Sequence, residues 1–416
     1  MKAVPDHLRH VLQTVAPTTE LDLILTDARD CVLARDVVTS EALPRFTHAT
    51  ADGYAVRSED VTHAHLDTPA QLRVLGDVRA GDEDIQRLVA GAAYRIMSGA
   101  VLPPDADAVV PLENTDRGLA TVRVSTPVTK GQNVRAHGTE APAGEKIIAA
   151  GTRLLPRHLA AVAALGMARV AVHPRPRVVV LSIGDEIVDP GHPLRVGQVP
   201  DVNSILLAEA TRRAGADPFR IGVVPDKTRT LREVLEDQLV RADVVITTGG
   251  VSAGDYDVVR EVLAPLGTVR FDHIDMDPAS QQGFGTVGDD VPIFALPGKP
   301  AAALIAFEVF VRPALQRMRG LTEASDLYRP VVDAQVTAGW KAPIQVRQFM
   351  PVTLVQEGQF WTASPVSSID LTGAGRGCGP GSIVAGLAQM NGLAIVAEGS
   401  GEVAAGSSVR AMLLAD

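Results

Sequence analysis

The sequence predicts a multidomain α/β protein whose central domain has three layers, with helices covering both faces of a parallel sheet. Between residues 176 and 320, apolar runs rich in valine and isoleucine alternate with helical segments, which is typical of such a sheet. Short valine-rich runs separated by glycine and proline turns come before this region, and further strand-like runs follow it. At 416 residues the chain is also longer than one hydrophobic core usually serves.

Each element of the alternating region has its own local signal. Buried strands are predicted for RVVVLSI, FRIGVV, ADVVI, residues 269–273 and VPIFAL. Helices are predicted for DVNSILLAEATRRAG, TRTLREVLEDQLVRA, DVVREVLAPLG and the segment from Pro300 to Arg317. In the first helix we expect Asn203 or Ser204 as the N-cap and Gly215 as the stop.

Four domains are expected from these patterns. Residues 1–43 and 145–175 form an elongated N-terminal domain, with amphipathic helices broken around Pro17. Residues 44–144 form an inserted β-rich domain, interpreted as a compact antiparallel sheet. Residues 176–320 form the α/β domain, and residues 321–416 a small β-barrel, with a sandwich as the alternative.

Composition narrows the function classes. The formal charge is −10, with 49 acidic against 39 basic residues, and this balance argues against binding to nucleic acid or to a membrane surface. Cys31 and Cys378 are too few and too far apart for a disulfide framework or a zinc site. The N-terminus lacks a signal-like apolar core and no apolar run could cross a bilayer, so we expect a cytoplasmic protein.

The stretch TTGGVSAGDYD, from Thr247 to Asp257, lies at a predicted strand-to-helix corner. Two consecutive glycines let backbone N–H groups approach a ligand closely, and a following helix N-terminus favours an anion such as phosphate. Asp255 and Asp257 would repel a bare phosphate, which indicates an accompanying divalent cation. The alternative is an ordinary glycine turn.

Acidic residues and glycines follow three of the predicted strands. In open parallel sheets, ligands bind beyond the carboxyl ends of the strands. We therefore expect one crevice to collect Asp185, Glu186, Asp226, Gly249, Gly250 and Asp255. Asp226 and Asp255 are the candidate Mg²⁺ ligands because that ion prefers carboxylate oxygens, water and phosphates. The alternatives are a helix N-cap for Asp226 and a solvated loop acid for Glu186.

Several of these segments together resemble one known family. The motifs SIGDEI, VNS, VPD, TTGGVSAGDYD and LPGKP, in this order, are similar to the molybdopterin-binding domain of the molybdopterin molybdenumtransferases, which include the E domain of gephyrin. Upstream, ALPRFTHATADGYAV, GDVRAGD, YRIMSGAVLPPDADAVVPLE and GQNVRAHGTEAPAGEKI also resemble family segments. The resemblance runs from about Leu8 to the C-terminus.

The resemblance implies an enzyme of molybdenum cofactor biosynthesis. Members hydrolyse adenylylated molybdopterin with a divalent ion, here Mg²⁺, load molybdate onto the two sulfurs and release AMP. It implies a homodimer in which Asp52 reaches the partner's crevice, although Asp52 alone also fits a turn aspartate before Gly53. A molybdopterin adenylyltransferase is an expected partner.

The family pattern also assigns the remaining site residues. The catalytic set is Asp52, Ser98, Glu186, Asp226 and Asp255, with Asp226 and Asp255 on the metal. The substrate and nucleotide set is Ser182, Gly184, Asp185, Gly249, Gly250, Ser252, Pro297, Gly298, Lys299, Pro300 and Arg347.

The chain departs from the family pattern in the region that should hold molybdate. Asp277 and Ser280 stand where the family has two lysines, Lys299 replaces an asparagine, and Ala302 replaces a serine. Losing charged hydrogen bonds worth about 1.5 to 3 kcal/mol each should weaken an anion site. Two interpretations therefore stay open: a transferase that uses Lys299 and Arg347 in a rearranged pocket, and a non-catalytic paralogue that binds pterin or nucleotide as a scaffold or carrier.

Overall fold

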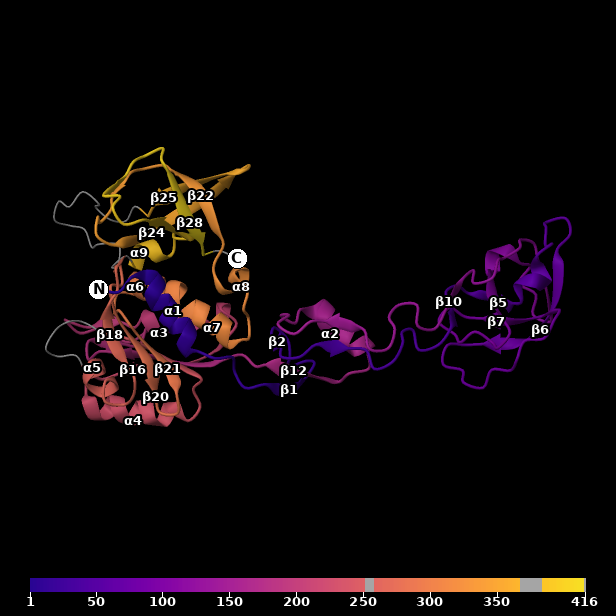
Figure 1. Cartoon of the computed structure of the whole chain (residues 1–416), viewed down its shortest axis with the longest axis horizontal. Coiled ribbons are helices and arrows are strands. Elements are labelled where there is room, and N and C mark those ends of the chain that lie inside the picture. Colours follow the sequence, from indigo (N-terminus) through magenta and orange to yellow (C-terminus); the bar gives the residue numbers. More distant parts are fainter. Residues whose placement is uncertain (251–257, 367–383, 415–416) are drawn as a thin grey trace. The chain divides into compact units, whose positions relative to one another are not determined.

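The computed structural model describes residues 1–250, 258–366 and 384–414. The chain divides into two compact units. The main unit comprises Met1–Arg35, Ala150–Leu159 and Ala168–Asp416, and the inserted unit comprises Asp36–Ala149 and Ala160–Met167. Figure 1 labels the helices and strands of both units. The finer division into four domains stays a prediction.

One of the two six-stranded sheets of the main unit confirms the expected α/β arrangement. Its strand order is β16-β13-β17-β21-β20-β18. The first four strands are parallel, whereas β20 runs antiparallel to both β21 and β18, so the sheet is mixed. The strands are β13 (Arg177–Ile183), β16 (Asp217–Val224), β17 (Val244–Thr248), β18 (Arg270–His273), β20 (Gln281–Val287) and β21 (Val291–Leu296).

Both faces of this sheet are buried. Along β13, Val178 and Val180 pack in one hydrophobic cluster and Val179 and Leu181 in another, as the two-residue repeat of a strand requires. Figure 1 shows α4 and α5 on one face and α6 and α7 on the other. The covering helices are α3 (Asn203–Arg213), α4 (Thr228–Leu239), α5 (Val258–Leu263), α6 (Pro300–Ala306) and α7 (Arg312–Met318).

The helix predicted from Pro300 to Arg317 is present but contains an irregularity. Between α6 and α7 the residues Phe307–Val311 form a π-helical turn. The turn lies just before Pro313, which has no backbone N–H to donate, and single π turns inside helices are a common way to absorb such a defect.

The N-terminal segment forms one helix where the sequence predicted more than one. Helix α1 (Val4–Thr14) buries Val4 and Val11 against the main unit, which confirms its apolar face. His7 lies edge-on to Phe310 at 4.8 Å between ring centroids, and burial lowers the pKa of His7 to about 4.

The helix expected after Pro17 was wrong. That segment contains β1 (Leu21–Ile24), which pairs with β12 (Arg169–His173), and β12 pairs in turn with β2 (Val32–Leu33). A strand forms here because residues far along the chain supply its hydrogen-bonding partner, a contact that local periodicity does not reveal.

The inserted unit contains a five-stranded sheet with the strand order β8-β5-β7-β6-β9. The expectation of a purely antiparallel sheet was wrong, because β6 and β7 are parallel. The sheet strands are β5 (Gly53–Val56), β6 (Ala70–Val78), β7 (Ala92–Ile96), β8 (Ala108–Pro111) and β9 (Thr121–Val124). Smaller elements are β3 (Val37–Val38), β4 (His48–Ala49), η1 (Ser58–Val61), η2 (Leu112–Asn114), β10 (Val134–Arg135) and β11 (Lys146–Ile148); α2 (Pro156–Ala164) spans the boundary between the two units.

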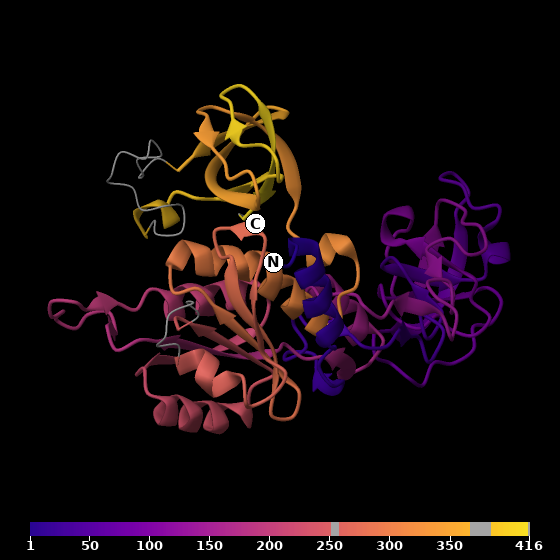
Figure 2. The same ribbon diagram turned by 60° about the vertical axis from the view of Figure 1, so that its left-hand side comes forward.

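The C-terminal strands close into the predicted barrel, drawn in orange and yellow in Figure 2. The ring runs β24-β25-β22-β28-β26 and returns to β24. Its strands are β22 (Val331–Val336), β24 (Arg347–Glu357), β25 (Phe360–Pro365), β26 (Gly392–Val396) and β28 (Ser408–Leu413). Short elements flank the ring: β19 (Met276–Asp277), α8 (Ala324–Leu327), β23 (Trp340–Lys341), α9 (Val384–Leu387) and β27 (Glu402–Val403).

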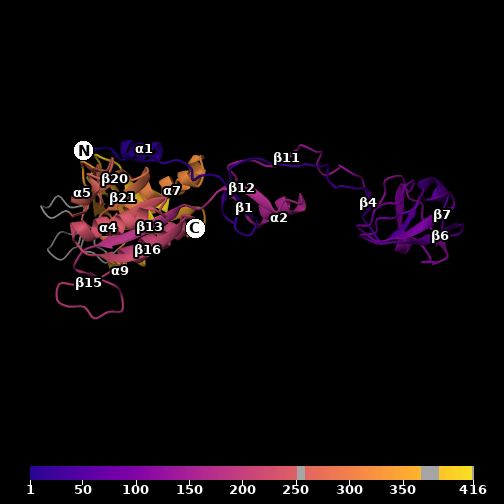
Figure 3. The ribbon, with the colours of Figure 1, turned by 90° about the horizontal axis from the view of Figure 1, so that it is seen from below.

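A two-stranded ribbon projects from the α/β sheet after β13. Strand β14 (Ile187–Val188) pairs in parallel with β15 (Val199–Pro200), and the loop before β15 stands away from the sheet in Figure 3. Within the described residues, every helix is too short or too polar to span a lipid bilayer.

Gly53 provides a test of the packing in the inserted unit. A Cβ atom on Gly53 would lie 2.0 Å from the carbonyl oxygen of Val110, whereas one on Gly76 of the same sheet would lie 3.8 Å from its nearest neighbour, the Tyr94 ring. We expect Gly53→Ala to destabilise the inserted unit by about 2 kcal/mol, as overpacking does, and Gly76→Ala to have little effect. Peptide-resolved amide hydrogen exchange over β5 and β7 measures this. Equal protection in the two variants would contradict the geometry.

Candidate functional site

The carboxyl ends of β13, β17 and β21 meet in a region where the backbones are unusually close. Gly249 and Gly250 have φ angles of +90° and +63°, which L side chains rarely tolerate. A Cβ on Gly249 would lie 2.4 Å from the carbonyl oxygen of Ile183, and one on Gly298 would lie 3.5 Å from the Cα of Gly249. Glycine at position 249 is therefore required by the close approach of its backbone to the end of β13.

Three of the predicted acids lie together at this edge. The backbone N–H of Asp226 donates to Oδ1 of Asp185 at 3.2 Å, and the carboxylate of Glu186 folds back to within 2.5 Å of where a Cβ on Gly184 would be. Burial raises the pKa of Asp226, a hydrogen bond from the backbone of Asp185 to the Asp226 carboxylate lowers it, and the negative charges of Glu186 and Asp185 raise it further. The three carboxylates thus form a region of concentrated negative charge.

The helix-cap alternative for Asp226 is wrong. Helix α4 begins after Lys227, and no side chain makes a capping hydrogen bond there. Two other predicted residues, Ser252 and Asp255, lie outside the described part of the chain, so their roles stay predictions.

A mostly apolar pocket of about 390 Å³ opens beside the acidic residues. Its walls come from the ends of β13, β17 and β21, from the β14–β15 ribbon and from the start of α3. The lining residues are Ile183, Glu186, Ile187, Val199, Pro200, Asp201, Val202, Asn203, Thr248, Gly249, Gly298 and Pro300. An apolar hollow with a few polar groups at its edge is the usual form of a small-molecule site.

The hydroxyl of Ser182 is committed to a buried network. It donates to Oδ1 of Asp201 at 2.7 Å, and the same carboxylate accepts the backbone N–H of Ser204 at 3.0 Å and the Ser204 hydroxyl. Nε of Arg220 donates to the Ser204 hydroxyl at 2.5 Å. Asp201 thereby ties the end of β13 to the start of α3 and holds this wall of the pocket in place.

Asp201 was not predicted as a site residue, and the expectation that Asn203 or Ser204 is the N-cap of α3 was wrong. Val202 holds the N-cap position of α3, while the backbone N–H of Ser204 is satisfied by the side chain of Asp201. The signal was present in the sequence, because an aspartate three residues before a helical N–H is a known capping pattern. Asn203 instead donates its Nδ2 to the carbonyl of Gly298 at 2.8 Å, which links α3 to the loop after β21.

Of the charged residues in the region expected to hold molybdate, one has no ion-pair partner among the described residues and the others are bound to neighbouring side chains. Lys299, the N-cap residue of α6, is exposed and has no ion-pair partner among the described residues. Arg347 instead pairs with Glu398 at 3.3 Å. Oδ2 of Asp277 accepts a hydrogen bond from Gln348 of the barrel strand β24 at 3.2 Å. Asp277 is the residue that stands where the family pattern has a lysine.

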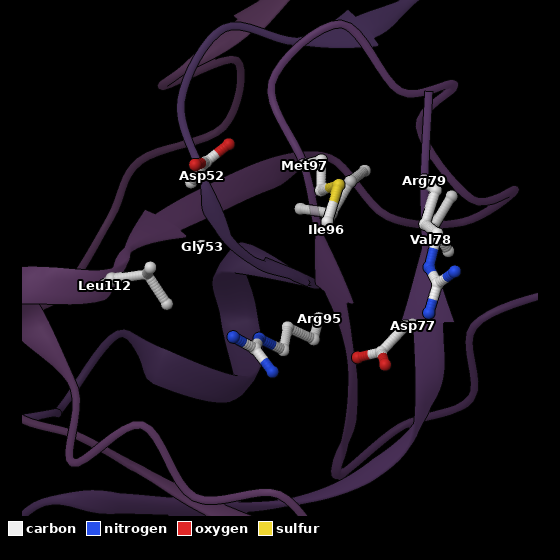
Figure 4. Close-up of a pocket in the computed structure, with 9 residues that line it drawn as sticks. All are labelled: Asp52, Gly53, Asp77, Val78, Arg79, Arg95, Ile96, Met97 and Leu112. Atoms are coloured by element: carbon white, nitrogen blue, oxygen red, sulfur yellow. The ribbon is translucent and has the colours of Figure 1, made fainter. Parts of the chain in front are cut away.

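The predicted residues Asp52 and Ser98 belong to the inserted unit and lie next to each other. The backbone N–H of Ser98 donates to Oδ1 of Asp52 at 2.7 Å, and Figure 4 shows the Asp52 side chain at the edge of a pocket in this unit. That Asp52 faces the crevice of a second chain stays a prediction.

The acidic region could hold a divalent cation with help from a ligand. In the described part of the chain, no three His, Cys, Asp or Glu side chains are placed to enclose a metal by themselves. Mg²⁺ needs only one or two carboxylates when waters and substrate phosphates complete its shell. The raised pKa of Asp226 marks a site where added positive charge would be favourable, so the residues present fit such an ion.

Comparisons with known proteins agree with this geometry. A model of the MoeA N-terminal region (domains I and II) matches residues 2–166, and a model of a probable molybdopterin-binding domain matches residues 179–317. A solved molybdopterin biosynthesis MoeA protein from Pyrococcus horikoshii superposes with a TM-score of 0.82 at 29% identity, covering 100% of this chain and 99% of that one.

Curated relatives match along almost the whole chain. Molybdopterin molybdenumtransferase 2 of Mycobacterium tuberculosis is 38% identical over 99% of both chains, and molybdopterin molybdenumtransferase 1 of the same organism is 35% identical over 100% of this chain and 99% of its own. With a relative this similar over its full length, and with the glycines and acids of the crevice in place, the chain belongs to the molybdopterin molybdenumtransferase family, whose members are transferases of molybdenum cofactor biosynthesis.

Proposed function

We propose that this chain inserts molybdate into adenylylated molybdopterin and releases AMP in a Mg²⁺-dependent reaction. The observation that carries the proposal is the meeting of Asp185, Glu186 and Asp226 beside an apolar pocket at the carboxyl ends of the parallel strands. A flat heteroaromatic ring suits the apolar walls, and a diphosphate with its cation suits the neighbouring carboxylates and glycine backbone.

In this reaction Asp226 and Asp255 bind the cation, and Glu186 orients or deprotonates the water that attacks phosphorus. Mg²⁺, when bound, supplies charge neutralisation of the diphosphate and polarises the bond that breaks. The remaining contacts to pterin, nucleotide and molybdate come from Ser182, Gly184, Asp185, Gly249, Gly250, Ser252, Pro297, Gly298, Lys299, Pro300 and Arg347. For Ser182 the buried bond to Asp201 makes this contribution indirect, through the shape of the pocket wall.

The proposal includes a cytoplasmic homodimer in which Asp52 and Ser98 of one protomer act at the crevice of the other. A molybdopterin adenylyltransferase would supply the nucleotide-bearing substrate. Asp52 has one oxygen on the Ser98 backbone N–H, which orients the carboxylate and leaves its second oxygen for a ligand.

A second candidate function is favoured by the environment of Arg347. Its ion pair with Glu398 and the acidic Asp277 in the adjoining strand reduce the positive charge available to an oxyanion. A non-catalytic paralogue that binds pterin or nucleotide, as a scaffold or carrier, would keep the crevice and lose this charge. The two functions differ in turnover, not in binding.

The first test is the reaction itself. Incubation of the full chain with adenylylated molybdopterin, Mg²⁺ and molybdate should release AMP and form molybdenum cofactor, as followed by chromatography and by reconstitution of a molybdenum enzyme. Asp226→Ala should lower the rate by about 100-fold or more, because metal stabilisation of several kcal/mol is lost. Glu236→Ala, an exposed acid on α4, is the matched control. Tight binding without AMP release would establish the carrier function instead.

Arg347 separates the two functions further. If it binds molybdate, Arg347→Gln should raise the KM for molybdate by about tenfold, since a charged hydrogen bond is worth about 1.5 to 3 kcal/mol, while Mg²⁺-dependent AMP release persists. Glu398→Gln should lower that KM by freeing the guanidinium. An unchanged KM in both variants would remove Arg347 from molybdate binding.

The raised pKa of Asp226 predicts a cost in stability. Because its folded-state pKa exceeds the unfolded value, the favourable contribution of the protonated form is present at low pH and is lost as pH rises through the folded pKa. Asp226→Asn should therefore raise the unfolding temperature of the metal-free chain at neutral pH, with the gain shrinking as the pH falls. Calorimetry measures this against Asp289→Asn, an exposed acid elsewhere. A lower unfolding temperature would contradict the electrostatic origin.

A further inference from the structure

One arginine connects the β14–β15 ribbon to the α/β sheet. Asp189 directly follows β14, and Asp201 directly follows β15. Nη2 of Arg220, on β16, donates to Oδ1 of Asp189 and lies 3.6 Å from Oδ2 of Asp201. Because β14 and β15 are parallel, both strands end on the same side of the ribbon. A single guanidinium therefore contacts the residue that follows each of them.

The ribbon itself is short and its loop is exposed. Its two strands pair over two residues each, and every residue from Asp189 to Gly197 is exposed. Figure 3 shows the loop before β15 standing away from the sheet. A two-stranded element of this length has few backbone hydrogen bonds to fix its position, so the side-chain contacts at its base matter.

The ribbon forms one apolar wall of the pocket. Ile187 of β14 and both residues of β15, Val199 and Pro200, line the pocket of about 390 Å³. The N–H of Val199 donates to the carbonyl of Glu186 at 2.9 Å, so the ribbon begins directly beside the acidic residues. A shift of the ribbon away from β16 would widen the pocket and remove apolar contacts from a bound ring.

The two contacts of Arg220 differ in burial. The Asp201 side chain is 1% exposed and also accepts the Ser182 hydroxyl and the N–H of Ser204, whereas the Asp189 side chain is 49% exposed. An exposed ion pair contributes little stability and can open without unfolding. The Asp201 contact therefore keeps Arg220 in place, and the Asp189 contact is the one that can open to release the ribbon.

Glycine in β16 leaves room for the Asp189 contact. A Cβ atom on Gly222 would lie 3.9 Å from Oδ2 of Asp189, so the Asp189 carboxylate lies over this strand two residues beyond Arg220. The carboxylate thus reaches back from the ribbon onto the sheet.

We propose that Arg220 is a positioning residue of the pocket: through Asp189 it holds the β14–β15 ribbon against the ring of the bound pterin nucleotide and so sets the affinity for that substrate. The inference rests on the proposed function, which supplies the ligand. Arg220 is not one of the described residues that line the pocket, so it acts through the ribbon. Loss of the contact lowers the fraction of molecules with the ribbon in place, and the apparent dissociation constant rises by the same factor.

Binding variants of the full chain test the proposal. Asp189→Asn removes the ribbon contact and leaves the buried network of Asp201 intact. The dissociation constant for adenylylated molybdopterin, measured without Mg²⁺, should rise about threefold, as for an exposed ion pair. Arg220→Gln should raise it about tenfold, because the hydrogen bond to Ser204 is also lost, and Arg220→Lys should restore part of the affinity. Arg229→Gln, an exposed arginine of α4, is the matched control and should bind like the unmodified chain.

Kinetics and amide exchange separate positioning from a general loss of structure. With Mg²⁺ and molybdate, Asp189→Asn should raise the KM for the pterin nucleotide by about the same factor as the dissociation constant and leave kcat within about twofold, whereas a loss of folded protein would lower kcat and leave KM unchanged. In the ligand-free chain, residues 187–200 should exchange amide hydrogens faster in Asp189→Asn and Arg220→Gln than in the control.

Three results would overturn the proposal. The first is that Asp189→Asn and Arg220→Gln match the control in dissociation constant, and the second is that they match it in amide exchange. The third is a full additional loss of affinity when Asp189→Asn is combined with Arg220→Gln, because both changes remove the same contact and their effects should not add. If the unmodified chain binds the pterin nucleotide but releases no AMP, the proposed transferase function fails, while binding and exchange still decide the role of Arg220.

Discussion

The site depends on one steric constraint, the approach of the diglycine to the end of β13. The carbonyl oxygen of Ile183 occupies the space that a side chain on Gly249 would need. The strands β13 and β17 are already paired along the sheet, and glycine at this position lets the loop after β17 pass close to the end of β13. The acidic loop after β13 and the walls of the pocket are placed by the same arrangement. A larger residue at Gly249 would push the loop after β17 away from the end of β13.

The acidic residues of the crevice and the charged residues Arg347 and Asp277 beside the barrel differ in whether they have partners within the protein. Asp185, Glu186 and Asp226 have no cationic partner among the described residues, and their mutual repulsion contributes to the raised pKa of Asp226. Arg347 already pairs with Glu398, and Asp277 is hydrogen-bonded to Gln348. Uncompensated charge at a strand edge is unfavourable for folding unless a ligand relieves it. The uncompensated carboxylates of the crevice are typical of a binding site. On the barrel, Arg347 and Asp277 already have partners within the protein.

Much of the fold could be predicted from local patterns, and the errors have a common cause. The continuous apolar run of β13 and the helical period of α1 depend on burial of nearby residues, and both were found. Strand β20 was missed because Gly283 and Gly285 interrupt its pattern. The glycines are required by close contacts with Phe271 and with the backbone of Val269, which belong to the strand region next to it. The parallel pairing of β6 and β7 and the strand β1 also depend on partners distant in sequence, which composition and period do not encode.

In the candidate site, the clustering of acids and glycines could be predicted, because charge and conformational freedom follow directly from residue type. The hydrogen-bonding partner of the Ser182 hydroxyl could not be predicted. The sequence shows a hydroxyl at the end of a strand, and a hydroxyl can serve a ligand or the protein. The fold decides: Asp201 accepts the hydroxyl of Ser182 together with the N–H and hydroxyl of Ser204. A buried carboxylate with this many donors cannot be replaced by a smaller acceptor without leaving polar groups unpaired, at a cost of about 1 to 3 kcal/mol each. The shape of this pocket wall therefore rests on a residue whose acceptor oxygens are already used within the protein.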